Sequence, residues 1–269
     1  MIKLRRISLP GDTLSQLTAL QTQIDRGGSY SARVSLAKIQ FARYNTSNNR
    51  IFSVVRKHLA KMCSGARRCV YCEDSCADEV EHIRPKNLYP DFVFTWDNYV
   101  YACGPCNGPK KNKFSVFSAT TKSLIDITRK PREKVREPER GTPVLLNPRQ
   151  EDPLKYMQLD LLGTFLFVPI KPKGSQAYLR AEYTIEVLRL NERDILLKAR
   201  REAFESYEAR LHQYISLRDS GGPSIKLKRL VRALRKMQHP TVWREMKRQH
   251  TLLPSLKELF DQAPEALSW

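Results

Sequence analysis

Four of the six cysteines stand in two C-x-x-C pairs, Cys69 with Cys72 and Cys103 with Cys106. Two such pairs from separate parts of a chain are the ligand pattern of a tetrahedral zinc site. Disulfides are rare in a reducing cytosol, so the pattern favours four thiolates around one structural zinc over a redox motif. It therefore predicts a compact metal-bound module between about residues 69 and 117.

Two cysteines lie outside the pairs. Cys63 is interpreted as a small buried apolar residue. Cys76 is an alternative zinc ligand if one of the four does not bind the metal.

The chain has 269 residues, enough for one large domain or two small ones. Its longest apolar stretch, residues 161–170, is interrupted by glycine and proline and is far shorter than the roughly 20 residues that span a bilayer. The amino terminus is basic but lacks the apolar segment of a secretory signal. We therefore expect a cytoplasmic protein without a membrane helix.

The charge balance points to a polyanionic partner. The chain carries 47 Lys and Arg against 28 Asp and Glu, a formal net charge of +19. Such an excess is typical of nucleic-acid-binding proteins, although a merely soluble basic surface is the alternative. Residues 1–60 are strongly basic, whereas residues 61–120 are nearly neutral. This distribution predicts basic flanks around a central segment whose acidic residues have another role.

Apolar spacing divides the chain into four regions. Residues 1–60 have helical periodicity, and residues 61–118 form the cysteine-rich module. Residues 119–142 are polar and rich in charge, which predicts a linker or, less simply, a DNA-contacting arm. Residues 143–269 begin with short strands, including a small hairpin, and continue as helices. A basic helix in this last region, residues 226–236, either grips DNA or is a solvated face.

The segment between the cysteine pairs carries the residue types of phosphodiester hydrolysis. That reaction needs a base to take a proton from water and a cation to offset charge on the phosphate. A neutral imidazole such as His82 suits the first task. Carboxylate and amide oxygens, such as those of Glu81 and Asn107, suit the second, because Mg²⁺ prefers oxygen ligands. Alone, His82 would be interpreted as a structural histidine or a surplus zinc ligand.

The order of these residues resembles a known nuclease motif. C-x-x-C, then E-H-x-x-P-K from Glu81, then W-D-N ending at Asn98, then C-x-x-C-N-x-x-K ending at Lys110 is similar to the zinc-bound form of the HNH nuclease family. The resemblance implies two antiparallel strands and a helix around a catalytic metal, the ββα-metal fold. The fold class expected is therefore α+β, mainly helical, with this module between helical amino- and carboxyl-terminal regions.

The resemblance also implies roles for individual residues. His82 is the implied general base, Glu81 a metal ligand and Asn98 the residue that orients the histidine and its loop. Asn107 stands where the family name has a second histidine, so the chain is an H-N-N variant. An amide oxygen in this position favours Mg²⁺ or Mn²⁺ over Zn²⁺ or Ni²⁺ as the catalytic ion. Nucleic-acid contacts are expected from three basic side chains, Arg84, Lys86 and Lys110, the last of which is alternatively a contact to the helix.

Segments outside the motif resemble the PtuB group of HNH proteins. They are N-P-R at residues 147–149, E-D-P at residues 151–153 and Y-T-I-E-V-L-R-L-N at residues 183–191. Members of this group accompany the ATPase PtuA in Septu and related retron anti-phage systems. The resemblance implies the nuclease subunit of a defence complex, gated by an ATPase, that acts on DNA. Formation of a homo-oligomer is left open. The alternatives are a catalytically silent zinc scaffold and a stand-alone HNH restriction enzyme or toxin.

Overall fold

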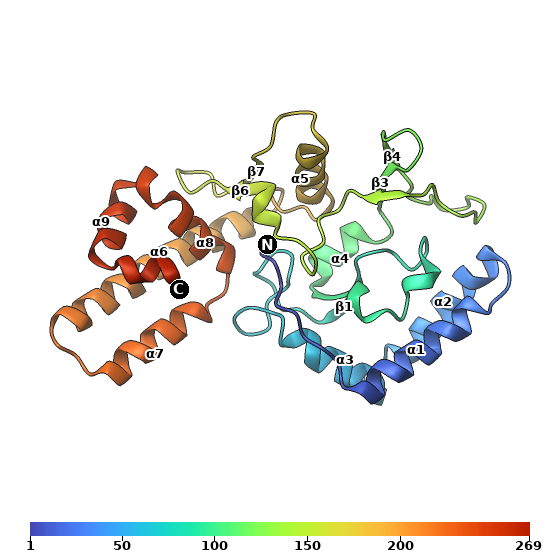
Figure 1. Ribbon diagram of the computed structural model, residues 1–269, viewed down its shortest axis with the longest axis horizontal. Coiled ribbons are helices and arrows are strands. Elements are labelled where there is room, and N and C mark those ends of the chain that lie inside the picture. Colours follow the sequence, from blue (N-terminus) through green and yellow to red (C-terminus); the bar gives the residue numbers. More distant parts are fainter.

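A computed structural model describes residues 1–269 and has a mixed α/β fold with nine α-helices and seven short strands. Figure 1 shows the amino-terminal helices on one side, the carboxyl-terminal helices on the other, and the short strands with α4 between them. One continuous apolar core joins these parts, because it includes Leu17, Leu146 and Leu256. No helix combines the length and apolar character needed to cross a membrane.

The amino-terminal side consists of α1 (Gly11–Asp25), α2 (Tyr30–Tyr44) and α3 (Arg50–Ala60). Ser29 and Asn49 start the second and third helices, since each side chain accepts a hydrogen bond from a backbone N–H of the first turn. Each helix buries one apolar face, as helical spacing predicts. Phe41 of α2 meets Phe52 of α3 with ring centroids 5.5 Å apart.

The central module contains two paired strands and a short helix. β1 (Glu79–His82) pairs antiparallel with β2 (Tyr99–Ala102), with Glu81 opposite Val100 and His82 opposite Tyr99. Helix α4 (Gly104–Lys110) follows β2 almost directly. Two short 3-10 turns, Pro90–Phe92 and Trp96–Asn98, lie in the connection between the strands. Cys69 and Cys72 precede this unit, whereas Cys103 lies between β2 and α4 and Cys106 lies within α4.

A three-stranded sheet follows, with β3 (Ser115–Ser118) between β4 (Leu124–Asp126) and β5 (Gly141–Pro143). Sequence analysis expected a linker at residues 119–142, and this segment supplies β4 and the start of β5. The segment is polar as a whole, so the two adjacent apolar residues of β4, Leu124 and Ile125, are too short a run to predict a strand. Gly141 permits the close pairing, because a Cβ atom there would lie 2.2 Å from the Phe117 carbonyl oxygen.

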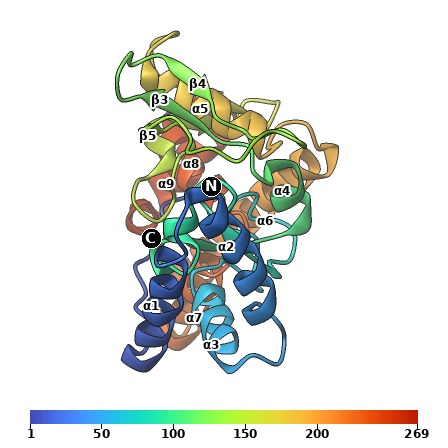
Figure 2. The same cartoon turned by 90° about the vertical axis from the view of Figure 1, so that its right-hand side faces the viewer.

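The carboxyl-terminal region begins with the antiparallel hairpin β6 (Met157–Leu159) and β7 (Phe167–Pro169), where the sequence predicts one. Helices follow: α5 (Gln176–Val187), α6 (Asp194–Asp219), α7 (Ser224–Arg235), α8 (Pro240–Gln249) and α9 (Pro254–Gln262). The long α6 packs against α7, α8 and α9. Figure 2 shows α5 beside the three-stranded sheet, at the end of the molecule opposite the free ends of α1 and α3.

Candidate active site

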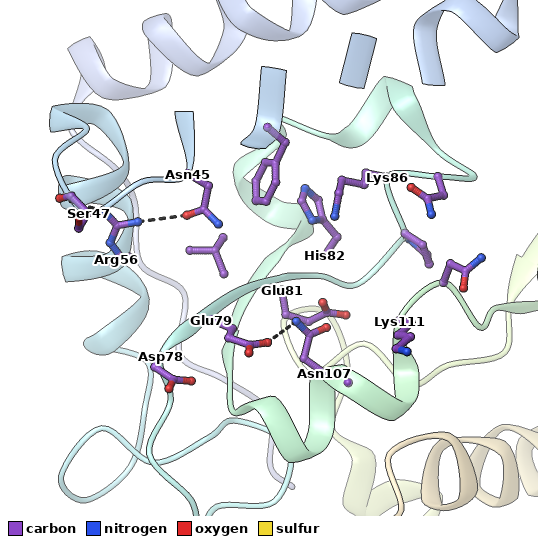
Figure 3. A pocket seen from close by; sticks show the side chains of 16 residues that line it. Asn45, Ser47, Arg56, Asp78, Glu79, Glu81, His82, Lys86, Asn107 and Lys111 are labelled. Carbon is purple, nitrogen blue, oxygen red and sulfur yellow. Dashed lines mark hydrogen bonds between the residues drawn. The ribbon is translucent and has the colours of Figure 1, made fainter. Parts of the chain in front are cut away.

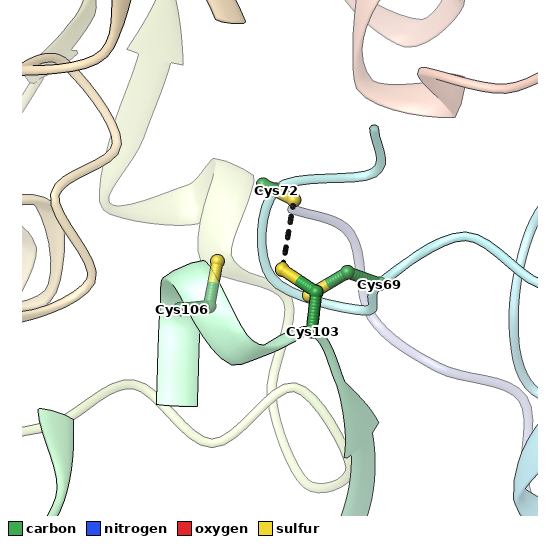
Figure 4. Close-up of side chains that lie close together, drawn as sticks. All are labelled: Cys69, Cys72, Cys103 and Cys106. Carbon is green, nitrogen blue, oxygen red and sulfur yellow. Dashed lines mark hydrogen bonds between the residues drawn. The ribbon is translucent and has the colours of Figure 1, made fainter. Parts of the chain in front are cut away.

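The two C-x-x-C pairs form one buried cluster. The sulfur atoms of Cys69, Cys72, Cys103 and Cys106 all lie within 4.8 Å of one another, and Figure 4 shows them converging from the loop after α3 and from the start of α4. The Sγ atoms of Cys72 and Cys103 are 3.8 Å apart. Four zinc–sulfur bonds of about 2.3 Å in a tetrahedron require a sulfur separation of about 3.8 Å. The four cysteines are therefore positioned to bind a metal ion, and their donor set fits zinc.

The other two cysteines stand apart from this cluster. Cys76 is exposed and Cys63 is half-buried. A basic side chain approaches the cluster instead: Arg193, just before α6, donates a hydrogen bond from Nη2 to Cys106 Sγ over 3.2 Å. Burial lowers the pKa of Arg193, but the Cys106 sulfur outweighs it, so the net shift is upward. This contact attaches the start of α6 to α4.

A cavity of about 740 Å³ lies beside β1 and α4. Its wall comprises residues from α2, α3, β1, α4 and the loop after β1, including Arg56, Glu79, Glu81, His82, Lys86, Asn107 and Lys111. Figure 3 shows Glu79 and Glu81 beside Asn107, while His82 points in the opposite direction, toward Lys86. Neighbouring residues of a strand alternate between its two faces, which explains why His82 and Glu81 border the cavity from different sides.

The ring of His82 is held by a backbone carbonyl. Its Nε2 lies 2.9 Å from the Val93 oxygen, and its centroid lies 4.4 Å from that of Phe41 in an edge contact. A carbonyl oxygen can only accept, so Nε2 carries the proton and Nδ1 is the acceptor of the neutral ring. Burial, with a smaller contribution from Lys86, lowers the pKa of His82 to about 3. The ring is therefore uncharged at neutral pH.

Glu81 forms a buried ion pair with Lys110, the last residue of α4. Lys110 Nζ also donates to the His82 carbonyl oxygen over 2.8 Å. Burial raises the pKa of Glu81, and the Lys110 charge opposes this shift. The Glu81 Oε1 atom is the oxygen that contacts the Lys110 ammonium, and no further donor binds it. A buried carboxylate oxygen with unused lone pairs is a suitable ligand for a hard cation.

Sequence analysis missed Glu79, which fixes the orientation of Asn107. The Asn107 Nδ2 atom donates to Glu79 Oε2 over 2.5 Å. The amide oxygen of Asn107 is therefore the end left free for another ligand. Glu79 and Glu81 are two residues apart on one strand, so their side chains share a face. This alternation of acidic residues along β1 was the signal from which Glu79 could have been found.

Asn98, at the end of the loop between β1 and β2, binds the start and the middle of that loop. Its Nδ2 donates to the carbonyl oxygens of Arg84 and Phe92, each over 3.0 Å, and its Oδ1 accepts from the Arg84 N–H over 2.8 Å. Phe92 directly precedes Val93, the residue whose carbonyl binds His82. The Asn98 side chain therefore supports the backbone that orients the histidine.

The three basic residues expected to contact nucleic acid have different surroundings. The Arg84 guanidinium lies 4.7 Å from the centroid of the Phe92 ring. Lys86 lines the cavity with its ammonium 5.1 Å from the centroid of the Phe41 ring. Lys110 is fully buried, so a contact with phosphate would require it to leave Glu81. Two other basic residues, Arg56 and Lys111, line the cavity; their spacing along the chain carried no signal.

The fold and the site together define a mixed α/β protein in which a four-cysteine cluster, positioned to bind a metal ion, adjoins a cavity lined by carboxylates, amides, a histidine and lysines. No family model and no solved structure matches the chain. The chain is 29% identical over 160 residues to the Septu protein PtuB of Bacillus mycoides strain KBAB4, covering 52% of this chain and 48% of that relative. It is 42% identical over 57 residues to the Septu protein PtuB of Bacillus thuringiensis, covering 19% of this chain and 22% of that relative.

The chain thus aligns with about half the length of the first of these relatives. The resemblance to the PtuB group that the sequence motifs indicate is confirmed by both matches.

Proposed function

We propose that this chain is a metal-dependent HNH endonuclease that hydrolyses phosphodiester bonds of DNA. The observation that carries the proposal is that His82, Glu81 and Asn107 line one cavity beside the paired strands β1 and β2. In an in-line displacement the attacking water and the leaving oxygen lie on opposite sides of phosphorus. A base on one side of the cavity and an ion site on the other match this requirement.

His82 is the proposed general base. Its Nε2 is engaged by the Val93 carbonyl, which leaves Nδ1 to take a proton from the attacking water. Asn98 is the proposed positioning residue, because its three hydrogen bonds hold the backbone that leads to Val93, at Arg84 and at Phe92. General-base catalysis of this kind contributes typically 10² to 10⁴-fold in rate.

Glu81 and Asn107 are the proposed ligands of a catalytic Mg²⁺ or Mn²⁺. When bound, such an ion offsets the negative charge that develops on the phosphate and the leaving oxygen. Glu79 keeps the amide oxygen of Asn107 directed away from its own carboxylate, so that this oxygen is available. Lys110 neutralises Glu81 within the protein interior, while Arg84 and Lys86 are the proposed contacts to the DNA backbone. The four cysteines hold a structural zinc that fixes the start of α4, and with it Asn107.

The biological setting is proposed from the relatives. Both are named Septu protein PtuB, and we propose that the chain is the nuclease subunit of a cytoplasmic anti-phage complex gated by an ATPase resembling PtuA. In this proposal residues 61–118 are the nuclease module, and residues 1–60 and 192–269 supply surfaces for the partner, for DNA or for a second copy. Co-purification tests this part: an associated ATPase supports it, whereas an active chain that binds no ATPase indicates a stand-alone nuclease.

Plasmid nicking tests the nuclease activity. The wild-type chain is incubated with supercoiled plasmid and Mg²⁺ or Mn²⁺, alone and with the ATPase partner, beside the His82→Ala variant. We expect ion-dependent nicking by the wild type and a loss of at least about 10²-fold in the variant. An equal rate in both removes His82 as the base. No nicking under any of these conditions, by a folded zinc-containing chain, would favour a catalytically silent scaffold.

A further inference from the structure

A second cavity, of about 520 Å³, has a wall that shares no residue with the cavity beside β1. Three distant segments form its wall: the extended residues 2–5, the loop that follows α3, and the end of α7. Five basic residues line it, namely Lys3, Arg5, Lys61, Arg235 and Lys236. All five are exposed.

The positive charges of this cavity are not neutralised within the protein. None of the five basic side chains takes part in any of the thirteen ion pairs of the chain. The cavity has one acidic residue, Glu73, which is 3% exposed and accepts hydrogen bonds from the Thr241 N–H and hydroxyl over 3.0 and 2.8 Å. Like charges gathered in this way repel one another, and a bound polyanion relieves that repulsion.

Direct contacts join the segments that form the wall of the cavity. Arg5 Nε donates to the Lys61 carbonyl oxygen over 2.9 Å, which joins the amino-terminal segment to the loop after α3. Gly65 in that loop has φ of +50°, and a Cβ atom there would lie 3.3 Å from the Gln238 nitrogen. Glycine is therefore needed where this loop meets the segment that follows α7. The relative positions of the basic residues follow from these contacts.

Helix α3 places this cavity next to the proposed active site. Arg56 of α3 lines the first cavity, and Lys61, directly after the same helix, lines the second. The backbone rises by about 8 Å between these two residues, so the two cavities lie at neighbouring positions along α3. No aromatic ring lines the second cavity, so it offers no platform on which a base could stack.

We propose that this basic cavity is a binding site for the phosphodiester backbone of DNA, independent of base sequence, adjacent to the site of cleavage. The inference deepens the proposed function, since it assigns a place to DNA beyond the metal-binding cavity. It also assigns DNA binding to only one end of α7. The end that contains Arg235 and Lys236 belongs to the cavity, whereas Lys226 and Lys228 are exposed on the same helix and do not line it.

Two matched double variants test the proposal. Arg235→Gln with Lys236→Gln removes two charges from the cavity, and Lys226→Gln with Lys228→Gln removes two from the distal part of α7. Binding of a fluorescently labelled DNA duplex is measured by anisotropy over a series of salt concentrations, without added divalent cation. Thermal unfolding and zinc content establish that both variants fold as the wild type does.

We expect the cavity variant to reduce the slope of log K against log salt by about 1.8, the value for two lost phosphate contacts, and the distal variant by less than half of that. Equal reductions, or no reduction by the cavity variant, overturn the proposal. If the wild type does not bind the duplex, both this site and DNA as substrate are overturned. If the cavity variant shows the reduced slope while the chain does not nick plasmid, the phosphate site stands and the proposed nuclease activity fails.

Discussion

At the scale of single residues, the site depends on which end of each polar side chain is engaged. Glu79 accepts from the nitrogen of Asn107, so the amide oxygen faces elsewhere. The Val93 carbonyl similarly selects the tautomer of His82. Residues that support metal ligands through hydrogen bonds commonly change metal affinity by about 10 to 100-fold when they are removed. In the proposed Mg²⁺ site, Glu79 is the residue to which this applies, because it binds the proposed ligand Asn107.

Glu79→Ala should raise the Mg²⁺ concentration that gives half-maximal nicking by about tenfold or more, because Asn107 loses the acceptor that orients it. A titration of Mg²⁺ against nicking rate measures this effect. Asp78→Ala is the matched control, since Asp78 lines the same cavity but has no hydrogen bond to Asn107. An equal shift in both variants would show that only the negative charge matters.

Lys110→Met should destabilise the fold by about 3 kcal/mol or more, because it leaves the buried Glu81 without its counter-ion. Denaturant unfolding of the zinc-bound chain measures the loss. The double variant Lys110→Met with Glu81→Gln removes the unpaired charge and should recover part of the stability. A double variant as unstable as the single one would mean that packing, not charge, explains the effect.

At the scale of elements, the β1–β2 loop and the short helix α4 depend on side-chain interactions more than on hydrogen bonds within their own backbone. The loop between β1 and β2 depends on Asn98, and the seven-residue α4 begins between two clustered cysteines. Helices of this length are not stable alone. The cysteine cluster and the hydrogen bonds of Asn98 therefore determine the positions of His82 and Asn107.

Asn98→Ala should reduce the maximal nicking rate while DNA binding is unchanged, because the loop that presents the Val93 carbonyl loses three hydrogen bonds. The unsatisfied backbone groups should also cost on the order of 1–3 kcal/mol of stability each. Nicking rate and duplex binding are measured in parallel. A variant that binds DNA less tightly but nicks at the wild-type maximal rate would contradict the positioning role.

Removal of the zinc that the four cysteines are proposed to bind should abolish nicking even in excess Mg²⁺. Without this ion nothing holds the start of α4, and therefore Asn107, in position. The experiment compares the untreated chain with a chelator-treated chain, before and after zinc is restored, and follows both nicking and the thermal unfolding midpoint. Full activity of a chain shown to contain no zinc would contradict a structural role for the cluster.

At the scale of the whole molecule, ion pairs join the carboxyl-terminal helices to the strands. Arg244 of α8 binds both oxygens of Asp152, over 3.0 and 2.7 Å, just before the hairpin β6–β7. Burial raises the pKa of Asp152, but the hydrogen bonds and charge of Arg244 outweigh this and lower it. A carboxyl with a lowered folded-state pKa stabilises the fold above the unfolded value, about 3.9, and this contribution is lost as pH falls through the folded value.

Asp152→Asn should therefore lower stability at neutral pH and make it fall less steeply below about pH 4 than in the wild type. Urea unfolding at neutral and acidic pH measures both effects. Lys257→Gln is the control, because it breaks an exposed pair with Asp261 that should contribute little. Parallel pH profiles for the wild type and Asp152→Asn would remove this ion pair as a source of acid sensitivity.

The sequence by itself determined the features that depend on short covalent spacing. Cysteines separated by two residues can bind one ion, and Glu81 and His82 lie side by side because they are adjacent in the sequence. The helical faces and the hairpin also follow from local periodicity. Tertiary structure alone decided which residues meet across long separations: Glu79 with Asn107, buried Lys110 with Glu81, and the amino-terminal segment with the end of α7. These contacts depend on how buried surfaces fit together, and that information is distributed over the whole chain.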